Sequence, residues 1–383
     1  MANQHDDRFD ALIVGAGVIG LACAWRAARA GLRIRVLERD VPGAGASGVA
    51  AGMLAPVGEA TWGEEALLRL GMRSHRAWPA FAGELAEASG HRIDFLERGA
   101  LHAALDGDEA AELRRRFELM RELELEAEWL RPAEARRVEP RLTPRLAGAV
   151  SAPHEAAVDP RALVGALRLA AQASGVEVIE GAEVVGSLTS GSAIDGVATA
   201  GGREHLADRV VLAAGAWSGA VDWLPEGVRP PVRPVKGEIL TLRAAGAAPI
   251  DRMVVSERVY LVPRADGRLV VGATVEERGF DTSVTAGGVL ELLREAYRAV
   301  PEIAELEVVE SAAGLRPGTP DNVPFVGPGD LEGLVLATGH YRNGILLAPV
   351  TAEAITALLL GEEPSAEVAA ADPARFGAGV EAL

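Results

Sequence analysis

The sequence predicts a two-lobed α/β protein, with a nucleotide-binding domain on a parallel sheet and a second lobe on a mixed antiparallel sheet. Three observations support this fold. A glycine-rich β-α-β pattern occupies residues 9–38, and a continuous apolar run at residues 210–217 is typical of a parallel strand buried on both faces. Alternating strand patterns between residues 230 and 311 then supply the second lobe.

The β-α-β pattern has the features of a dinucleotide site. A buried strand at residues 11–14 runs into Gly15, which permits a tight turn, and Gly17 lets the backbone approach a pyrophosphate. Gly20 allows the next helix to pack closely on the sheet, and the N-terminus of that helix favours negative charge. The second strand ends on Glu38, which is suited to the ribose hydroxyls and disfavours a 2′-phosphate. This pattern excludes neither NAD nor FAD.

The next part of the chain alternates small-residue, helical and strand-like segments. Residues 43–56 are rich in glycine and alanine, which indicates a close approach of the backbone to a ligand. Helices are expected at residues 64–89 and 108–129, with strand-like pieces at 93–96 and 100–104. Asp159 and Pro160 form an N-cap and a first helical position, so a helix is expected to run to residue 174 and stop at Gly175.

The second half of the chain is rich in strands. Strands are expected at residues 176–179, 183–188, 194–200, 235–242, 259–263, 268–273 and 333–339, and helices at 285–299 and 343–360. This order predicts a discontinuous nucleotide-binding domain made of residues 1–90, 150–225 and 312–365. The substrate lobe is then made of residues 91–149 and 226–311.

Composition restricts the kind of partner. The formal net charge of −17 argues against a nucleic acid or an anionic membrane, so a small molecule is the expected ligand. The single cysteine, Cys23, excludes an internal disulfide, and the seven histidines show no metal-ligand spacing, so no metal is expected. No apolar run is long enough to span a bilayer and the first residues are polar, so a cytoplasmic location is expected.

Seven segments together resemble the D-amino-acid oxidase family of flavoproteins, and within it most closely the glycine oxidases of thiamine biosynthesis. They are residues 15–20, 50–54, 234–238, 260–264, 268–274, 313–319 and 339–349. The resemblance extends over nearly the whole chain and implies a Rossmann-type FAD-binding domain joined to a substrate lobe. It implies FAD as the cofactor, and the lack of a cysteine near residue 314 indicates that FAD is held without a covalent bond.

The resemblance also assigns site residues. Arg316 lies in a turn that Pro317 makes rigid, and a guanidinium there is suited to grip a carboxylate through two hydrogen bonds. Arg316, Tyr260, Arg342 and Met53 are the residues that the resemblance places at the substrate. The residues it places at the cofactor are Gly15, Gly17, Val18, Ile19, Gly20, Glu38, Arg39, Ala46, Ser47, Ala51, Gly52, Met53, Val184, His340, Tyr341, Arg342, Asn343, Gly344, Ile345 and Leu346.

Arg258 and Val275 depart from the family pattern, which has histidine and methionine near the active-site cavity, so the substrate range stays open. No side-chain base stands out among Tyr260, Arg316 and Arg342. The substrate is therefore expected to react as a neutral amine.

The expected reaction is oxidative deamination of glycine and other small amines or D-amino acids. Its products are the keto acid (glyoxylate from glycine), ammonia and hydrogen peroxide, with dioxygen as the second substrate and a role in thiamine thiazole synthesis. Two alternatives stay open: a D-amino-acid or sarcosine oxidase or dehydrogenase, and a flavin-binding subunit of a larger complex. By resemblance the chain is expected to form a homo-oligomer, a tetramer.

Overall fold

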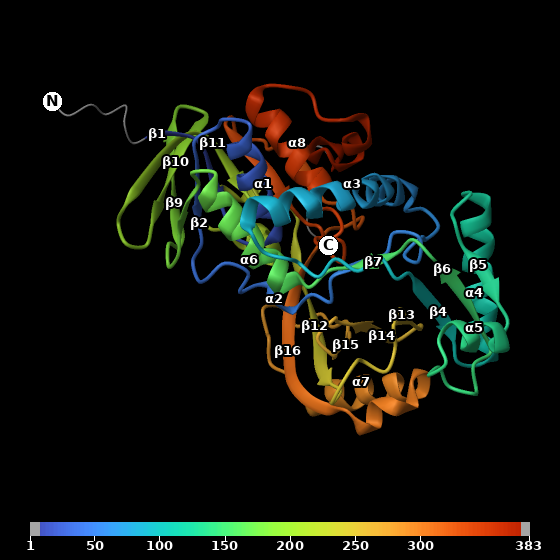
Figure 1. Cartoon of the computed structure of the whole chain (residues 1–383). Helices are drawn as coiled ribbons and strands as arrows, with labels where there is room; N and C mark the ends of the chain where they lie inside the picture. The colour runs from blue at the N-terminus through green and yellow to red at the C-terminus, as the bar shows by residue number, and fades with distance from the viewer. Residues whose placement is uncertain (1–7, 377–383) are drawn as a thin grey trace.

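The computed structural model describes residues 8–376 and contains two eight-stranded sheets in separate halves of the molecule (Figure 1). A two-stranded ribbon of β3 (Met53–Leu54) and β7 (Ala156–Ala157) accompanies them. Among the helices of this part of the chain, none combines the length and the apolar character needed to cross a membrane.

The first sheet has a central parallel core. Its main path is β17 (Phe325–Pro328), β18 (Leu334–Thr338), β11 (Glu204–Leu212), β1 (Arg8–Val14), β2 (Ile34–Leu37) and β8 (Glu177–Ile179). The neighbours from β18 to β8 pair in parallel, and β17 is antiparallel. An antiparallel hairpin of β9 (Val184–Ser190) and β10 (Ala193–Thr199) extends from β11. The apolar run that begins at residue 210 thus contributes to a parallel strand of this sheet, as predicted.

Helices cover the first sheet. The central one is α1 (Val18–Arg29), which contacts both α6 (Pro160–Ala173) and α8 (Ala348–Leu360), while α3 (Glu65–Ser89) lies across α6 and α8 (Figure 1). Trp25, Trp78 and Phe81 are fully buried there and meet edge to face. The Asp159 carboxylate accepts hydrogen bonds from the first N–H groups of α6, as its N-cap position predicts.

The second sheet is mixed, as predicted. Its order is β16 (Glu307–Gly318), β12 (Arg233–Arg243), β15 (Arg268–Gly272), β14 (Tyr260–Pro263), β13 (Met253–Val255), β4 (Ala100–Ala104), β6 (Gly148–Ala152) and β5 (Glu128–Leu130). The pair β13–β4 is parallel and the other neighbours are antiparallel. The helices beside this sheet are α4 (Gly107–Glu122), α5 (Pro132–Val138) and α7 (Ala286–Ala299) (Figure 1).

The remaining elements are short. They are α2 (Ala46–Val49) and the 3₁₀ turns η1 (Gly215–Ala220), η2 (Glu226–Val228), η3 (Pro301–Glu305), η4 (Ala366–Ala371) and η5 (Pro373–Phe376). The strand β16 crosses the predicted domain boundary between residues 311 and 312, and the division of the chain into segments stays a prediction.

The strand expected within residues 210–217 ends at Leu212, and Trp217 lies in η1. Three other element predictions were also wrong. The helix expected to begin at Asn343 begins at Ala348, because Pro349 is compatible only with a first helical turn. The helix expected at residues 108–129 ends at Glu122, and Trp129 lies in β5. Residues 93–96 form no strand beyond a single bridge at Leu96.

Candidate active site

A cavity of about 1060 Å³ is lined by residues from both large sheets and from the loops between them. Of the residues predicted at the cofactor or the substrate, all except Gly20 line this cavity. Gly20 is buried beneath it, where its Cα faces the carbonyl oxygen of Gly15 too closely for a side chain. One cavity therefore brings together segments from both ends of the chain.

The glycine turn forms one end of the cavity. Gly15 has a φ of +110°, and a Cβ there would lie 2.5 Å from the carbonyl oxygen of Ala213, so only glycine fits. Helix α1 begins at Val18, whose N–H donates to the Ser47 hydroxyl at 3.0 Å. The first-turn N–H groups of a helix have no acceptor within the helix, so this end of α1 suits a pyrophosphate.

The Glu38 carboxylate is tied to the backbone beside this turn. It accepts hydrogen bonds from the Ala16 N–H at 2.7 Å and from the Asp40 N–H at 3.0 Å. A carboxylate has about four acceptor positions, so acceptor capacity remains for hydroxyl donors in the cavity. Val184, predicted near the adenine, lines the same region.

Trp217 is a cavity residue that the sequence analysis did not single out. The Arg39 guanidinium lies 3.9 Å from the centre of its ring, and the Phe280 ring stacks on it with centroids 5.9 Å apart. Trp217 lies in η1 and is half-buried. The signal in the sequence is its place after a buried strand that ends in small residues. Phe280 belongs to the loop after β15, so this contact links the two sheets.

Arg316 lies near the end of β16 and faces the cavity. Its Nη1 donates to the carbonyl oxygens of Lys236 at 3.2 Å and Thr274 at 3.1 Å. Gly237 makes this position available, because a Cβ there would lie 2.5 Å from the Arg316 Cζ. The guanidinium is therefore held by two carbonyls on one side and is directed toward the cavity on the other.

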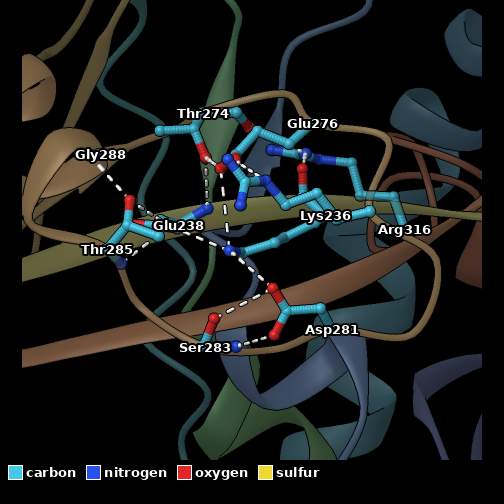
Figure 2. A network of polar contacts seen from close by, with 10 residues as sticks. Lys236, Glu238, Thr274, Glu276, Asp281, Ser283, Thr285, Gly288 and Arg316 are labelled. Atoms are coloured by element: carbon cyan, nitrogen blue, oxygen red, sulfur yellow. Dashed lines mark hydrogen bonds and ion pairs between the residues drawn. The ribbon is translucent and has the colours of Figure 1, made fainter.

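A buried ionic network supports those two carbonyls (Figure 2). The Lys236 side chain is fully buried, and its Nζ lies 3.1 Å from Glu238, 3.7 Å from Asp281 and 3.9 Å from Glu276. The Thr274 hydroxyl accepts from the Glu238 N–H at 2.9 Å and donates to Glu276 at 3.1 Å. The loop after β15 is thereby fastened to β12 directly behind Arg316.

Tyr260 stands beside Arg316 at the start of β14. Gly272 lies opposite in β15, where a Cβ would come within 2.5 Å of the Tyr260 hydroxyl oxygen. Burial raises the pKa of the Tyr260 hydroxyl, and the neighbouring Arg316 only partly opposes this shift. Tyr260 therefore stays protonated at neutral pH and can donate a hydrogen bond to an anion held by Arg316.

Residues 339–347 connect β18 to α8 through a series of turns, and residues 339–346 line the cavity. The Arg342 guanidinium lies 5.2 Å from the centre of the Tyr341 ring. His340 is buried, its Nε2 lies 2.9 Å from the Thr351 hydroxyl, and burial lowers its pKa to about 3. His340 is therefore neutral at physiological pH, and its hydrogen bond helps to hold the turns in place.

The cavity wall also includes Met53 of β3 and, six residues later, Glu59. Burial raises the pKa of the Glu59 carboxyl, and the charge of Arg342 is the largest influence in the opposite direction. The sequence analysis missed Glu59, which belongs to none of the motifs. The two departures from the family pattern, Arg258 and Val275, also line the cavity, and both are exposed.

The cavity fits a non-covalent FAD. The glycine turn, the start of α1 and Glu38 suit a dinucleotide, and Arg316 and Tyr260 line the same cavity from the second sheet, so a cofactor can lie between them. The single cysteine, Cys23, is fully buried in α1 outside the cavity, and burial raises the pKa of its thiol. No cysteine is therefore placed to attach a flavin.

Comparison with known proteins agrees with this description. A family model described as FAD dependent oxidoreductase (DAO) matches residues 10–358. The chain is 37% identical over 366 residues to the glycine oxidase of Geobacillus kaustophilus (strain HTA426), a match that covers 94% of this chain and 96% of that protein. The crystal structure of glycine oxidase from Geobacillus kaustophilus has a TM-score of 0.91 at 36% identity, covering 96% of this chain and 99% of that one.

A third relative is larger than this chain. The bifunctional protein ThiO/ThiG of Trichormus variabilis is 37% identical over 357 residues, which make up 92% of this chain and 53% of that protein. These matches confirm the predicted fold and the predicted cofactor. The chain belongs to the DAO family of FAD-dependent oxidoreductases, and FAD is its cofactor.

Proposed function

We propose that this enzyme oxidises glycine, and other small amino acids with a free or methylated amine, to the keto acid and hydrogen peroxide, with release of ammonia from a free amine and methylamine from a methylated one. The observation that carries the proposal is the convergence of Arg316 and Tyr260 in the cavity that begins at the glycine turn. A planar guanidinium with a neighbouring hydroxyl donor is suited to one carboxylate, held in one orientation. The glycine oxidase relatives support the choice of substrate class.

In this proposal each residue has a defined task. Arg316 binds the substrate carboxylate with the rest of its guanidinium, since Nη1 is already committed to two carbonyls. Tyr260 adds a hydrogen bond, and Met53 borders the side chain of the substrate. Fixing the carboxylate places the Cα–H at one position in the cavity, which is the orientation that a hydride transfer requires.

The predicted cofactor residues complete the proposal. The glycine turn, Ser47 and the start of α1 hold the pyrophosphate, while Glu38 faces the ribose and Val184 the adenine. The 340–346 turns contact the isoalloxazine. Bound FAD supplies a hydride acceptor that dioxygen can reoxidise, with hydrogen peroxide as the product. A role in thiamine thiazole synthesis agrees with the ThiO/ThiG name of one relative. The homo-oligomer and the cytoplasmic location stay predictions.

A panel of amino acids tests the proposal. The purified chain should be yellow, should release FAD on denaturation, and should consume oxygen with glycine, sarcosine or small D-amino acids. Anaerobic bleaching of the flavin by the same amino acids without oxygen uptake would indicate a dehydrogenase. No bleaching with any of them would refute the proposed function and favour a subunit that needs a partner.

A further inference from the structure

The turn at residues 55–60 is held in place by buried polar groups that the proposed function does not use. The Gly58 N–H donates to the Glu155 carboxylate at 2.5 Å, and the Gly58 carbonyl accepts from the Arg116 guanidinium. Glu155 in turn lies 3.2 Å from the His102 ring, and both side chains are almost completely buried. Gly58 has no space for a side chain, because a Cβ there would overlap the His102 ring. The next residue, Glu59, is thus presented by a fixed backbone.

The Glu59 carboxylate lies at the cavity wall without a direct partner. Among residues 8–376, no hydrogen bond and no ion pair reaches its oxygens, although its side chain lines the cavity. Charged or titratable groups face it from several elements. They are Arg342 of the turns before α8, Arg116 of α4, His102 of β4, Glu155 between β6 and β7, and Tyr260 of β14.

Glu59 lies in the same cavity as Arg316 and Tyr260, which are proposed to bind the substrate carboxylate. Arg342 lines this cavity too. The charge of Glu59 influences the pKa of the Tyr260 hydroxyl, which stands beside Arg316. Another acidic residue of the cavity wall, Glu64, already accepts a hydrogen bond from Asn322 at 2.7 Å. An amino acid is a zwitterion, so a site with arginine at one end is complemented by an unpaired carboxylate at the other.

We propose that Glu59 is the amine subsite: its carboxylate binds the substrate ammonium group and accepts one proton from it. The inference rests on the proposed function. The N–H bond of the ammonium breaks, an O–H bond forms on Glu59, and the nitrogen keeps the electron pair. The product is the neutral amine, whose lone pair is needed when hydride leaves Cα. This replaces the expectation that the substrate must lose its proton without help from the protein.

The burial of Glu59 has a definite consequence for pH. A carboxyl whose pKa is raised is a stronger base than a solvated one, so it is better matched to an ammonium group. It is also protonated at a higher pH, and the protonated form cannot accept a proton. Flavin reduction by subsaturating glycine should therefore rise with pH as Glu59 ionises and then level off.

The test compares the wild type with Glu59→Gln, which removes the charge and keeps the shape. Flavin reduction is followed by anaerobic stopped-flow absorbance, and acetate binding by the shift of the flavin spectrum. Acetate carries the carboxylate without the amine, so this titration requires no turnover. Glu64→Gln is the matched control, because it removes a wall charge that is already hydrogen-bonded.

Glu59→Gln should retain FAD, and its apparent rate constant for reduction by glycine near pH 7 should fall about tenfold or more, as expected for a lost charge-assisted hydrogen bond. Its reduction rate should keep rising to alkaline pH, following the free amine in solution. Acetate should bind about threefold more tightly or better, because a like charge has been removed. The control should keep the wild-type pH profile.

Three outcomes would overturn the inference: an unchanged pH profile, unchanged or weaker acetate binding, or the same changes in Glu64→Gln. If Glu59→Gln does not fold, Glu59→Asp replaces it, with slower glycine reduction and unchanged acetate binding as the expected result. Wild-type oxidation of glycine with a silent Glu59→Gln refutes only the amine subsite. No amino-acid oxidation by the wild type refutes the proposed function itself.

Discussion

Replacing Gly237 with alanine tests whether catalysis depends on the position of the Arg316 guanidinium, without removing any functional group. A Cβ at residue 237 would lie 2.5 Å from the Arg316 Cζ, whereas ordinary contacts begin at 3.4 Å. The Cζ must therefore retreat by at least about 0.9 Å, because both Nη atoms of the guanidinium lie closer still. It is the end of a flexible side chain, so it should move more readily than the backbone of β12.

A displacement of this size should lower kcat/KM strongly although it should have little effect on folding. Misplacing a reacting group by about 1 Å can reduce a rate about a hundredfold, so kcat/KM for glycine should fall by about that factor. The backbone at residue 237 is extended strand that alanine adopts without strain. We therefore expect a folded yellow protein with its FAD retained.

Oxygen consumption at varied glycine concentrations measures the effect, and the visible spectrum checks the flavin. Gly186→Ala is the matched control, because Gly186 also lies in a strand, away from the cavity, and a Cβ there would meet Ala198 at an ordinary 3.4 Å. The reasoning would be refuted if Gly237→Ala changed kcat/KM by less than about threefold. The Arg316 guanidinium would then not depend on the space beside Gly237.

Three further predictions concern single residues. Arg316→Ala should lower kcat/KM by about a hundredfold or more, equivalent to about 3 kcal/mol, with FAD retained, and unchanged glycine kinetics would show that Arg316 is structural. Lys236→Met should lower the free energy of unfolding in urea by about 3–5 kcal/mol, because it removes the cation that is paired with the buried Glu238 carboxylate, and a loss below about 1 kcal/mol would contradict the buried pair. The pKa of His340 is about 3 in the folded chain and about 6.5 in the unfolded chain. Between these two pH values the side chain is therefore protonated in the unfolded chain and neutral in the folded one. Stability should therefore fall as pH decreases through this window, by about 1.4 kcal/mol per pH unit for this group, and His340→Gln should remove that slope in urea unfolding at pH 5 and 6.5.

The parts of the fold that the sequence predicted well depend on local signals. The turn at Gly15 and the start of α6 at Asp159 and Pro160 are each determined by a few neighbouring residues. The end of α4 has no such signal. The chain leaves the helix through Glu124, which has a φ of +54°, and neither glycine nor proline marks the place. Charged helical composition therefore extended the expected helix too far.

The residues of the candidate site also fall into two groups: those within local motifs, and those whose surroundings come from distant parts of the chain. Residues within motifs, such as Arg316 and Tyr260, were predicted because their neighbours in sequence resemble a family, and both line the cavity. Glu59 was not found, since its setting comes from Arg116, 58 residues after Gly58, and from Glu155, 97 residues after it. Lys236 falls within the resembling segment at residues 234–238, but its role behind Arg316 depends on three acidic residues from two segments.

Strand register explains how Arg316 and Tyr260 both come to face the cavity, although no local motif encodes this geometry. Arg316 faces Val235 across β16 and β12, with Gly237 two residues further along β12, and Tyr260 faces Gly272 across β14 and β15. Because side chains alternate between the faces of a strand, a slip of one residue in either pair would turn the guanidinium or the phenol away from the cavity. Gly237 and Gly272 reflect this register in the sequence, because each leaves space for a side chain of the neighbouring strand. Their position one strand away from a predicted arginine and tyrosine is therefore evidence about the site that a search for motifs alone does not use.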